Sequence, residues 1–438
     1  MSDKVLNTAG SGKRVARNIV VASFGNALEW FDFIVYGFLA ATIAKVFFPT
    51  GDEFSSLLLA TASFGVPFIV RPIGAVLIGR YADRKGRKPA LTATVAMMLF
   101  GTLIIALTPS YQTIGLYAPV LIVIARVIQG FAAGGEFGCA TAFLAEQNPD
   151  RRGFYGSWQF ASQGVSSILA AGVAWLIFSI FTAEEIVSWA WRIPFFLGLA
   201  IGPVGLIMRR FMHETEEFTA AQSEARHHEP QQNGTRERLG AILACVGLVM
   251  GGTVSSYVLV LYLPTFAVRE LHLPPATAFA SAAAMGVVSF IVSPLAGALS
   301  DRFGRGRVMG LGLVCAALSI IPTFVVLLSH PTLTTLIICQ LAAGFLLSFY
   351  TGPLAALMAE IFPTRERTFG ISVGYNISVT VFGGFAPTIL TLLTYVTKSD
   401  MAPVWYVLLA ILVSLASLVN VTARFRQARR GRVLSVEG

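Results

Sequence analysis

Gly79-Arg-Tyr-Ala-Asp83-Arg84-Lys-Gly86-Arg87 is a short, strongly charged stretch that follows a long apolar segment of this 438-residue chain. A close copy, Gly297-Ala-Leu-Ser-Asp301-Arg302-Phe-Gly304-Arg305, follows another apolar segment almost half a chain later. A second motif repeats at nearly the same offset, because Glu146-x-x-Pro149-x-Arg151 recurs as Glu360-x-x-Pro363-x-Arg365. Two halves that repeat loop motifs between hydrophobic segments predict a two-lobed membrane transporter with its site between the lobes.

The composition also indicates a membrane protein. Hydrophobic residues make up 55% of the sequence, charged residues make up 13%, and the mean hydropathy is +0.71. Soluble domains carry about 25% charged residues. The net charge of +9 comes from short basic clusters between apolar segments, which argues against nucleic-acid binding. The sequence shows no Walker loop and no histidine-based metal or nucleophile pattern, so we expect no enzyme activity, no metal and no cofactor.

Twelve apolar segments are long enough to cross a bilayer, which takes about 20 residues. They lie at roughly 19–45, 55–79, 89–108, 114–145, 157–182, 189–211, 239–268, 276–299, 308–328, 332–361, 368–396 and 402–423. A backbone in lipid must satisfy its own hydrogen bonds, so the predicted fold is all-α with twelve transmembrane helices. The polar segment 212–238 divides them, which predicts one lobe over 1–211, a cytoplasmic linker over 212–238, and a second lobe with a short tail over 239–438.

The basic residues predict the orientation in the membrane. Of the 32 Lys and Arg residues, 26 lie in the termini and the alternate loops on the same side, whereas the opposite loops hold only Lys45, Arg269 and Lys398. Positive charge stays on the cytoplasmic side. We therefore predict a multi-pass protein of the cell membrane with both termini in the cytoplasm.

The span interiors of the second half contain no ionisable residue. Those of the first half contain five, namely Glu29, Asp32, Arg71, Arg126 and Glu136. Such residues are costly in a bilayer and are functional candidates by default. A substrate anion that binds an arginine would be repelled by the surplus carboxylates unless one is protonated, and burial favours the neutral carboxyl. This arrangement predicts coupling of a proton to an anion. The alternative is that Arg126–Asp32 or Arg71–Glu136 are static structural pairs.

Uncharged polar residues are expected to complete the cavity. Gln159 and Gln163 share one face of span 5, and buried amides and hydroxyls need partners. The predicted substrate ligands are Arg126, Arg71, Gln129, Gln159, Gln163, Tyr257, Tyr375 and Asn376. The predicted proton-coupling residues are Glu29, Asp32 and Glu136.

The repeated loop motifs are expected to act as gates. An aspartate at a helix end can pair with the arginines that follow it and with the positive N-terminus of a neighbouring helix, which would latch the cytoplasmic side. We expect the stronger latch at Asp83 and the weaker one at Asp301. The alternative is that the basic residues only set topology and bind anionic lipid. The predicted gating residues are Asp83, Arg84, Arg87, Asp301, Arg302, Arg305, Glu146, Arg151, Glu360 and Arg365.

Gly-x-x-x-Asp-Arg-x-Gly-Arg after spans 2 and 8 resembles the signature of the major facilitator superfamily, and Arg126-x-x-Gln129-Gly130 resembles a second one. Gly25-Asn-Ala-Leu-Glu29-Trp-Phe-Asp32 and Arg71-Pro-Ile-Gly74 are similar to motifs of the metabolite–proton symporters within it. Gly153-Phe-Tyr-Gly-Ser-Trp158-Gln159 is similar to the citrate–proton symporter branch. One departure is Gly306, which displaces the last basic residue of the second signature and is expected to weaken its contacts.

The resemblance covers nearly the whole chain and implies the major facilitator fold. It implies import of a citrate-like tri- or dicarboxylate with protons, by alternating access, in a bacterial inner membrane. The implied partners are the acid anion, protons and the lipid bilayer, and no obligate protein partner is expected.

Two other functions stay open from the sequence. One is proton symport of a zwitterionic osmolyte such as betaine or proline. Family members that sense osmolarity resemble chains with a long C-terminal coiled coil, whereas only about fifteen residues without heptads follow the last span here, which favours the metabolic acid. The other is a channel, which concentrative uptake abolished by a protonophore would exclude.

Overall fold

The computed structural model describes residues 2–210, 235–364 and 366–434. Within these ranges every regular element is a helix, and twelve helical segments are long and apolar enough to cross a membrane, as predicted. The first half contains α1 (Ser2–Phe38), α2 (Ala40–Phe47), α3 (Glu53–Lys85), α4 (Arg87–Leu107), α5 (Tyr111–Ile114), α6 (Tyr117–Ala145), α7 (Arg152–Ile180), α8 (Ala183–Ser188) and α9 (Ile193–Arg210). The second half contains α11 (Thr235–Ser256), α12 (Leu263–Arg269), α13 (Pro275–Phe303), α14 (Arg305–Ser329), α15 (Leu333–Ile361), α16 (Arg367–Ser378), α17 (Ala386–Thr397) and α18 (Ala402–Leu434).

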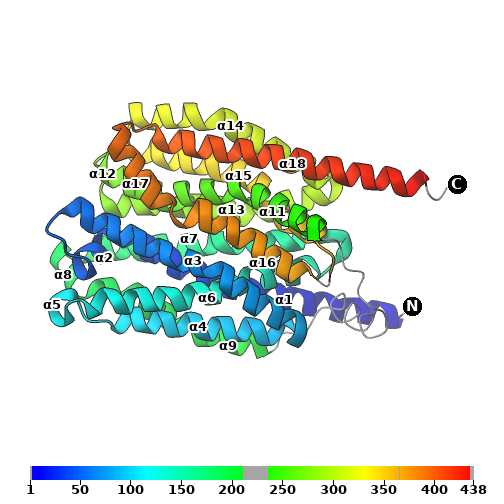
Figure 1. Cartoon of the computed structure of the whole chain (residues 1–438), viewed down its shortest axis with the longest axis horizontal. Coiled ribbons are helices and arrows are strands. Elements are labelled where there is room, and N and C mark those ends of the chain that lie inside the picture. Colours follow the sequence, from blue (N-terminus) through cyan, green and yellow to red (C-terminus); the bar gives the residue numbers. More distant parts are fainter. Residues whose placement is uncertain (1, 211–234, 365, 435–438) are drawn as a thin grey trace.

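The two halves of the chain form two sets of helices that lie side by side (Figure 1). Both termini lie at one end of the bundle, on the right in Figure 1, which we call the basic end. The short helices α2, α5, α8 and α12 lie at the other end, which we call the opposite end. The halves meet where α7 packs along α13 and where α3 packs against α16.

Glycines allow α7 and α13 to approach closely. A Cβ atom on Gly297 would lie 2.3 Å from the carbonyl oxygen of Gly153, and a Cβ on Gly164 would lie 2.5 Å from that of Gly286. Only glycine fits at such distances, and small residues are the usual means by which membrane helices pack backbone to backbone. The contact between the halves is therefore tight along this pair of helices.

Two spans of the second half contain a π-helical turn, at Tyr257–Tyr262 and Val379–Gly384. Each turn precedes a proline in the first turn of the next helix, Pro264 in α12 and Pro387 in α17. A proline has no backbone N–H, and its ring clashes with the carbonyl group four residues earlier. The helix relieves this clash by widening locally, and such π-turns are frequent at functional sites.

Several boundaries differ from the prediction. Helix α7 begins at Arg152 instead of 157, and α18 continues to Leu434 instead of ending at 423. Helix α11 begins at Thr235, so the last four residues of the predicted linker 212–238 are helical, whereas 211–234 lie outside the described residues. Hydropathy marks only the lipid-embedded part of a helix, whereas alanine, glutamine and arginine continue a helix into water.

Candidate functional site

Two arginines are fully buried in the first half of the chain. Arg71 on α3 has its Nη2 atom 3.2 Å from Oε1 of Glu29 on α1. Its guanidinium lies 4.4 Å from the ring centroid of Phe68 and 4.7 Å from that of Phe33. The structural pair considered from the sequence, Arg71 with Glu136, is not formed. Arg71 pairs with Glu29 instead.

Arg126 on α6 is linked to Asp32 through an intervening amide. Its Nη1 donates to Oε1 of Gln129 at 2.9 Å. Nε2 of Gln129 lies 3.3 Å from Oδ2 of Asp32 and 3.0 Å from the hydroxyl of Thr102. The Thr102 hydroxyl also donates to Asp32. The direct Arg126–Asp32 pair is thus replaced by a chain of hydrogen bonds in which Gln129 contacts both charges.

The three buried carboxylates have different surroundings. Glu29 accepts from Arg71, as described above. Glu136 on α6 accepts a hydrogen bond from the hydroxyl of Thr94 on α4 at 2.8 Å. Oδ1 of Asp32 has no hydrogen-bond partner among the described residues and faces Gly198 on α9. Glu29 and Asp32 lie three residues apart on α1 and share a helical face, but they belong to two separate networks.

A cavity of about 50 Å³ lies between the two halves, with room for about four water molecules. It is lined from α1 and α7 on one side and from α11, the π-turn after it, α13 and α15 on the other. Two predicted ligands, Gln163 and Tyr257, line it. The other polar residues of the lining were not predicted from the sequence: Ser167, Ser256, Ser289, Ser293 and Thr351. Ser289 and Ser293 lie four residues apart on one helix, and this spacing is a signal that could have found them.

Neither buried arginine lines this cavity. An aromatic layer lies between the two arginines on one side and the cavity on the other. We define it as Trp30, Phe33, Phe64, Phe68 and Tyr257. The ring of Tyr257 lies edge-on to those of Trp30, Phe64 and Phe68, with centroids 5.9, 6.3 and 5.7 Å away. Trp30 and Tyr257 line the cavity, whereas Phe33 contacts both guanidinium groups, at 4.7 Å and 4.8 Å from its centroid. The arginines therefore lie behind this layer.

Three other predicted ligands hold helices together and do not line the cavity. Nε2 of Gln159 donates to Oδ1 of Asn26 at 2.8 Å. Nδ2 of Asn376 donates to the carbonyl oxygen of Gly134 in the other half at 2.7 Å. Tyr375 stacks on Phe137, also in the other half, with ring centroids 3.3 Å apart. In this conformation these residues join the two halves or neighbouring helices.

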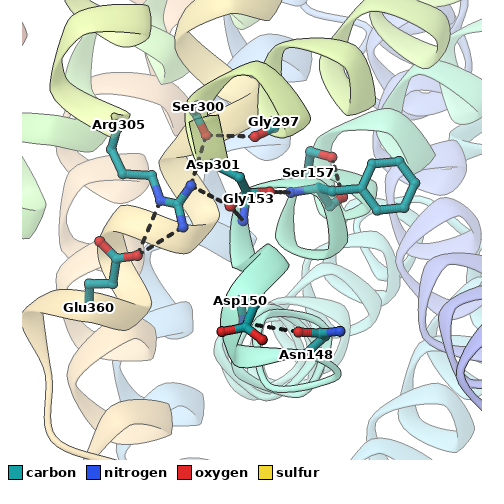
Figure 2. Close-up of polar contacts among 10 residues, drawn as sticks. Asn148, Asp150, Gly153, Ser157, Gly297, Ser300, Asp301, Arg305 and Glu360 are labelled. Carbon is teal, nitrogen blue, oxygen red and sulfur yellow. Dashed lines mark hydrogen bonds and ion pairs between the residues drawn. The ribbon is translucent and has the colours of Figure 1, made fainter. Parts of the chain in front are cut away.

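The second copy of the Gly-x-x-x-Asp-Arg motif, which contains Asp301 and Arg305, joins the halves (Figure 2). The Asp301 carboxylate, at the end of α13, accepts the backbone N–H groups of Gly153 and Phe154 at 2.8 and 2.9 Å. These two N–H groups belong to the first turn of α7, where the helix carries partial positive charge. Arg305 lies 2.5 Å from Asp301 and 3.1 Å from Glu360, which holds the carboxylate in place (Figure 2).

A buried ion pair forms a second contact between the halves. Nη1 of Arg367, at the start of α16, lies 2.7 Å from Oε1 of Glu146, just after α6, and their side chains are 5% and 0% exposed. The repeated motif predicted Arg365 for the gate, but that residue lies outside the described residues. The structure brings Glu146 together with Arg367, two residues later.

The remaining gating residues divide into two groups. The side chains of Asp83 and Arg87 lie outside those described, and Arg84, Arg151 and Arg302 are exposed. Gly306 does not keep Arg305 from its two partners, although we expected it to weaken this copy. A Cβ atom on Gly306 would lie 2.4 Å from Cγ2 of Thr422 on α18, so glycine there allows α14 to pack against α18.

Comparisons with known proteins agree with this architecture. Residues 18–238 match the family described as sugar (and other) transporter, and residues 244–435 match the Major Facilitator Superfamily. The citrate-proton symporter of Klebsiella pneumoniae is 38% identical over 91% of this chain and 90% of its own length. The proline/betaine transporter of Escherichia coli (strain K12) is 35% identical over 95% of this chain and 85% of its own.

A solved structure shares the fold. The proton:xylose symporter XylE bound to 6-bromo-6-deoxy-D-glucose superimposes with a TM-score of 0.77 at 17% identity, covering 93% of this chain and 95% of that one. The charged loop motifs, the twelve spans and these likenesses lead to one conclusion: the chain belongs to the major facilitator superfamily of membrane transporters, as its motifs predicted.

Proposed function

We propose that this transporter imports a small carboxylic acid, a citrate-like tri- or dicarboxylate, together with protons across a bacterial inner membrane. The basic end faces the cytoplasm in this proposal, because positively charged loops are retained there. Two six-helix lobes alternately expose the cavity between them to either side. The relative named as a citrate-proton symporter supports this substrate class.

The observation that carries the proposal is the state of the two buried arginines. Nε and Nη1 of Arg71 and Nε of Arg126 have no hydrogen-bond partner among the described residues. Buried donors without a partner are costly, and a guanidinium matches a carboxylate in a two-pronged hydrogen-bonded pair. A substrate carboxylate that reaches these groups would satisfy them.

The aromatic layer determines access to the arginines. Trp30 and Tyr257 line the cavity and also lie in this layer, so a change in their side-chain rotamers would open a path. The cavity of about 50 Å³ is far below the range of about 300–1,000 Å³ usual for ligand sites. We infer that substrate binding widens the cavity and displaces the aromatic layer, which opens the path to the arginines.

Asp32 is our candidate for the coupled proton. A carboxylate that binds Arg126 would compete with Gln129, which now links Arg126 to Asp32. Asp32 would then be a buried charge with less compensation, and burial disfavours a charge that has no partner. Protonation of Asp32 removes this cost, so the anion and the proton bind together.

Betaine or proline is the second candidate substrate. Trp30 and Tyr257 both line the cavity, and aromatic rings bind quaternary ammonium groups. A relative named as a proline/betaine transporter is 35% identical. The carboxylate of a zwitterion would use the same arginines, and its cation would face the aromatic rings.

Competition in proteoliposomes tests the proposal. Purified protein is reconstituted, a pH gradient is imposed with the interior alkaline, and uptake of radiolabelled citrate is measured with competing 2-oxoglutarate, betaine or proline. We expect citrate to accumulate, 2-oxoglutarate to compete, and a protonophore to abolish accumulation. Uptake of betaine or proline that citrate does not inhibit would establish the alternative. Citrate flux that only dissipates its own gradient would indicate a channel.

A further inference from the structure

Two of the few basic residues on the opposite side of the bundle line the same pocket. The opposite loops contain only Lys45, Arg269 and Lys398. A pocket of about 350 Å³ lies between the halves at the opposite end and is lined by Lys45 from α2 and Arg269 from α12. The pocket thus receives one cation from each half of the chain, and its volume lies in the range of small-molecule sites.

The charge in this pocket is unbalanced. Among the described side chains, its lining contains no Asp or Glu, and neither cation forms a hydrogen bond or ion pair with the described residues. Glu184 and Glu185 on α8 are exposed and do not line it. Glu270 and Asp400 do not line it either, but they line an adjoining pocket that Arg269 also lines. Thr42 and Thr265 add hydroxyl groups to the lining. The pocket therefore favours an anion.

An aromatic contact between the halves separates this pocket from the central cavity. Phe279 on α13 lies against Phe38 on α1 and Phe178 on α7, with ring centroids 5.0 and 5.2 Å apart, and all three line the pocket. Gly37 lines the pocket too, and a Cβ on it would lie 3.0 Å from Cδ2 of Leu261, which lines the central cavity. The wall between the two spaces is one layer of side chains thick.

We propose that this pocket is an external loading site, where Lys45 and Arg269 bind carboxylates of the substrate before the aromatic contact opens. The inference rests on the proposed function, because it assumes that the substrate is an anion taken up from the opposite side. A di- or tricarboxylate can contact both cations at once, which raises its local concentration beside the central cavity. The site binds weakly because both side chains are exposed.

Initial rates of radiolabelled citrate uptake into right-side-out membrane vesicles test the site. We expect the double variant K45Q/R269Q to raise KM about fivefold, the effect of losing two exposed ion pairs, with Vmax unchanged. Both side chains are exposed, so the change removes no packing. Charge-preserving K45R/R269K should retain the wild-type KM, and added salt should reduce the difference between wild type and K45Q/R269Q.

Lys398→Gln is the matched control. Lys398 lines an adjoining pocket together with Arg269, but Glu270 and Asp400 line that pocket as well. Lys398→Gln should therefore leave KM unchanged. An unchanged KM in K45Q/R269Q, or an equal rise in Lys398→Gln, would overturn the loading site while wild-type citrate uptake stands. Wild-type protein that transports neither citrate nor 2-oxoglutarate overturns the proposed function and the anion site together.

Discussion

The two halves of the molecule surround one cavity with different chemistry. The first half contributes every ionisable residue placed deep in the described spans, namely Glu29, Asp32, Arg71, Arg126 and Glu136. The second half contributes most of the hydroxyl groups that line the cavity and the two π-helical turns. Because the repeat makes the halves related in sequence, this difference is a specialisation. In the function proposed above, charge recognition and proton coupling belong to the first half, and the second half shapes and closes the cavity.

Arg126→Lys should have the largest effect. Lysine keeps the charge but cannot form a two-pronged pair with a carboxylate. We expect kcat/KM for citrate to fall about 30-fold or more, as when a buried charge pair is broken. Arg126→Ala should be worse because it leaves Asp32 less compensated. Well-folded Arg126→Lys protein that binds citrate with wild-type affinity would exclude Arg126 as a ligand. Rescue of citrate transport by an added Asp32→Asn would indicate that the Arg126–Asp32 network has a structural role.

Asp32→Asn should separate coupling from binding. Asparagine can still accept from Thr102 and Gln129 but cannot carry the proton. We expect proton-driven accumulation of citrate to be lost, whereas citrate–citrate counterflow, which needs no net proton movement, continues. Glu29→Gln serves as the comparison, since it removes the partner of Arg71 and should impair binding as well. Accumulation by Asp32→Asn at wild-type levels would transfer the coupling role to another carboxylate.

Asp301→Ala tests the closing role of the second half. The change removes the two hydrogen bonds to the N-terminus of α7 and one of the two partners of Arg305. We expect maximal turnover to change several-fold while the equilibrium affinity for citrate stays within about twofold, because the latch lies away from the cavity. Because Asp83 occupies the position of Asp301 in the first copy of the motif, we expect Asp83→Asn to behave in the same way. Exposed Arg307 on α14 provides the control, since Arg307→Gln should change neither quantity. Loss of citrate affinity with unchanged conformational exchange would argue against a gate.

Tyr257→Phe should have the smallest effect. Tyr257 lines the cavity, and its hydroxyl is buried and has no hydrogen-bond partner among the described residues. Its removal costs no internal contact, so a rise in KM of about two- to fivefold would report a lost hydrogen bond to the substrate. Tyr375→Phe is the control because Tyr375 stacks on Phe137 away from the cavity. Equal effects in both variants would assign Tyr257 a packing role.

Much of the architecture could be predicted from the sequence. Apolar runs give the spans because a helix must cross a hydrocarbon layer of nearly constant thickness, and the cost of buried charge singles out Arg71, Arg126 and the three carboxylates. The hydrogen-bond and ion-pair partners of these buried residues could not be predicted. The spacing within a helix shows that Glu29 and Asp32 share a face, but not that α3 supplies a partner to one and α4 to the other.

Local backbone geometry was also beyond the sequence analysis. Pro264 predicts a π-turn at Tyr257–Tyr262 only when it is already known that the helix continues past this proline. Trp30 lies within one of the family motifs, but the sequence does not mark it as a cavity residue, because tryptophan in a membrane helix is usually a packing or interfacial residue. The gate shows the same limit, since only the geometry of the first turn of α16 places Arg367 against Glu146.

The most direct test of the account is the number of protons taken up when citrate binds. Isothermal titration of the purified protein, in buffers with different ionisation enthalpies, measures this number without transport. We expect net proton uptake on citrate binding by the wild-type protein and its loss in Asp32→Asn, with citrate still bound. Binding of citrate without proton uptake, or the same uptake in Asp32→Asn as in wild type, would contradict the coupling of a carboxylate at Arg126 to a proton at Asp32.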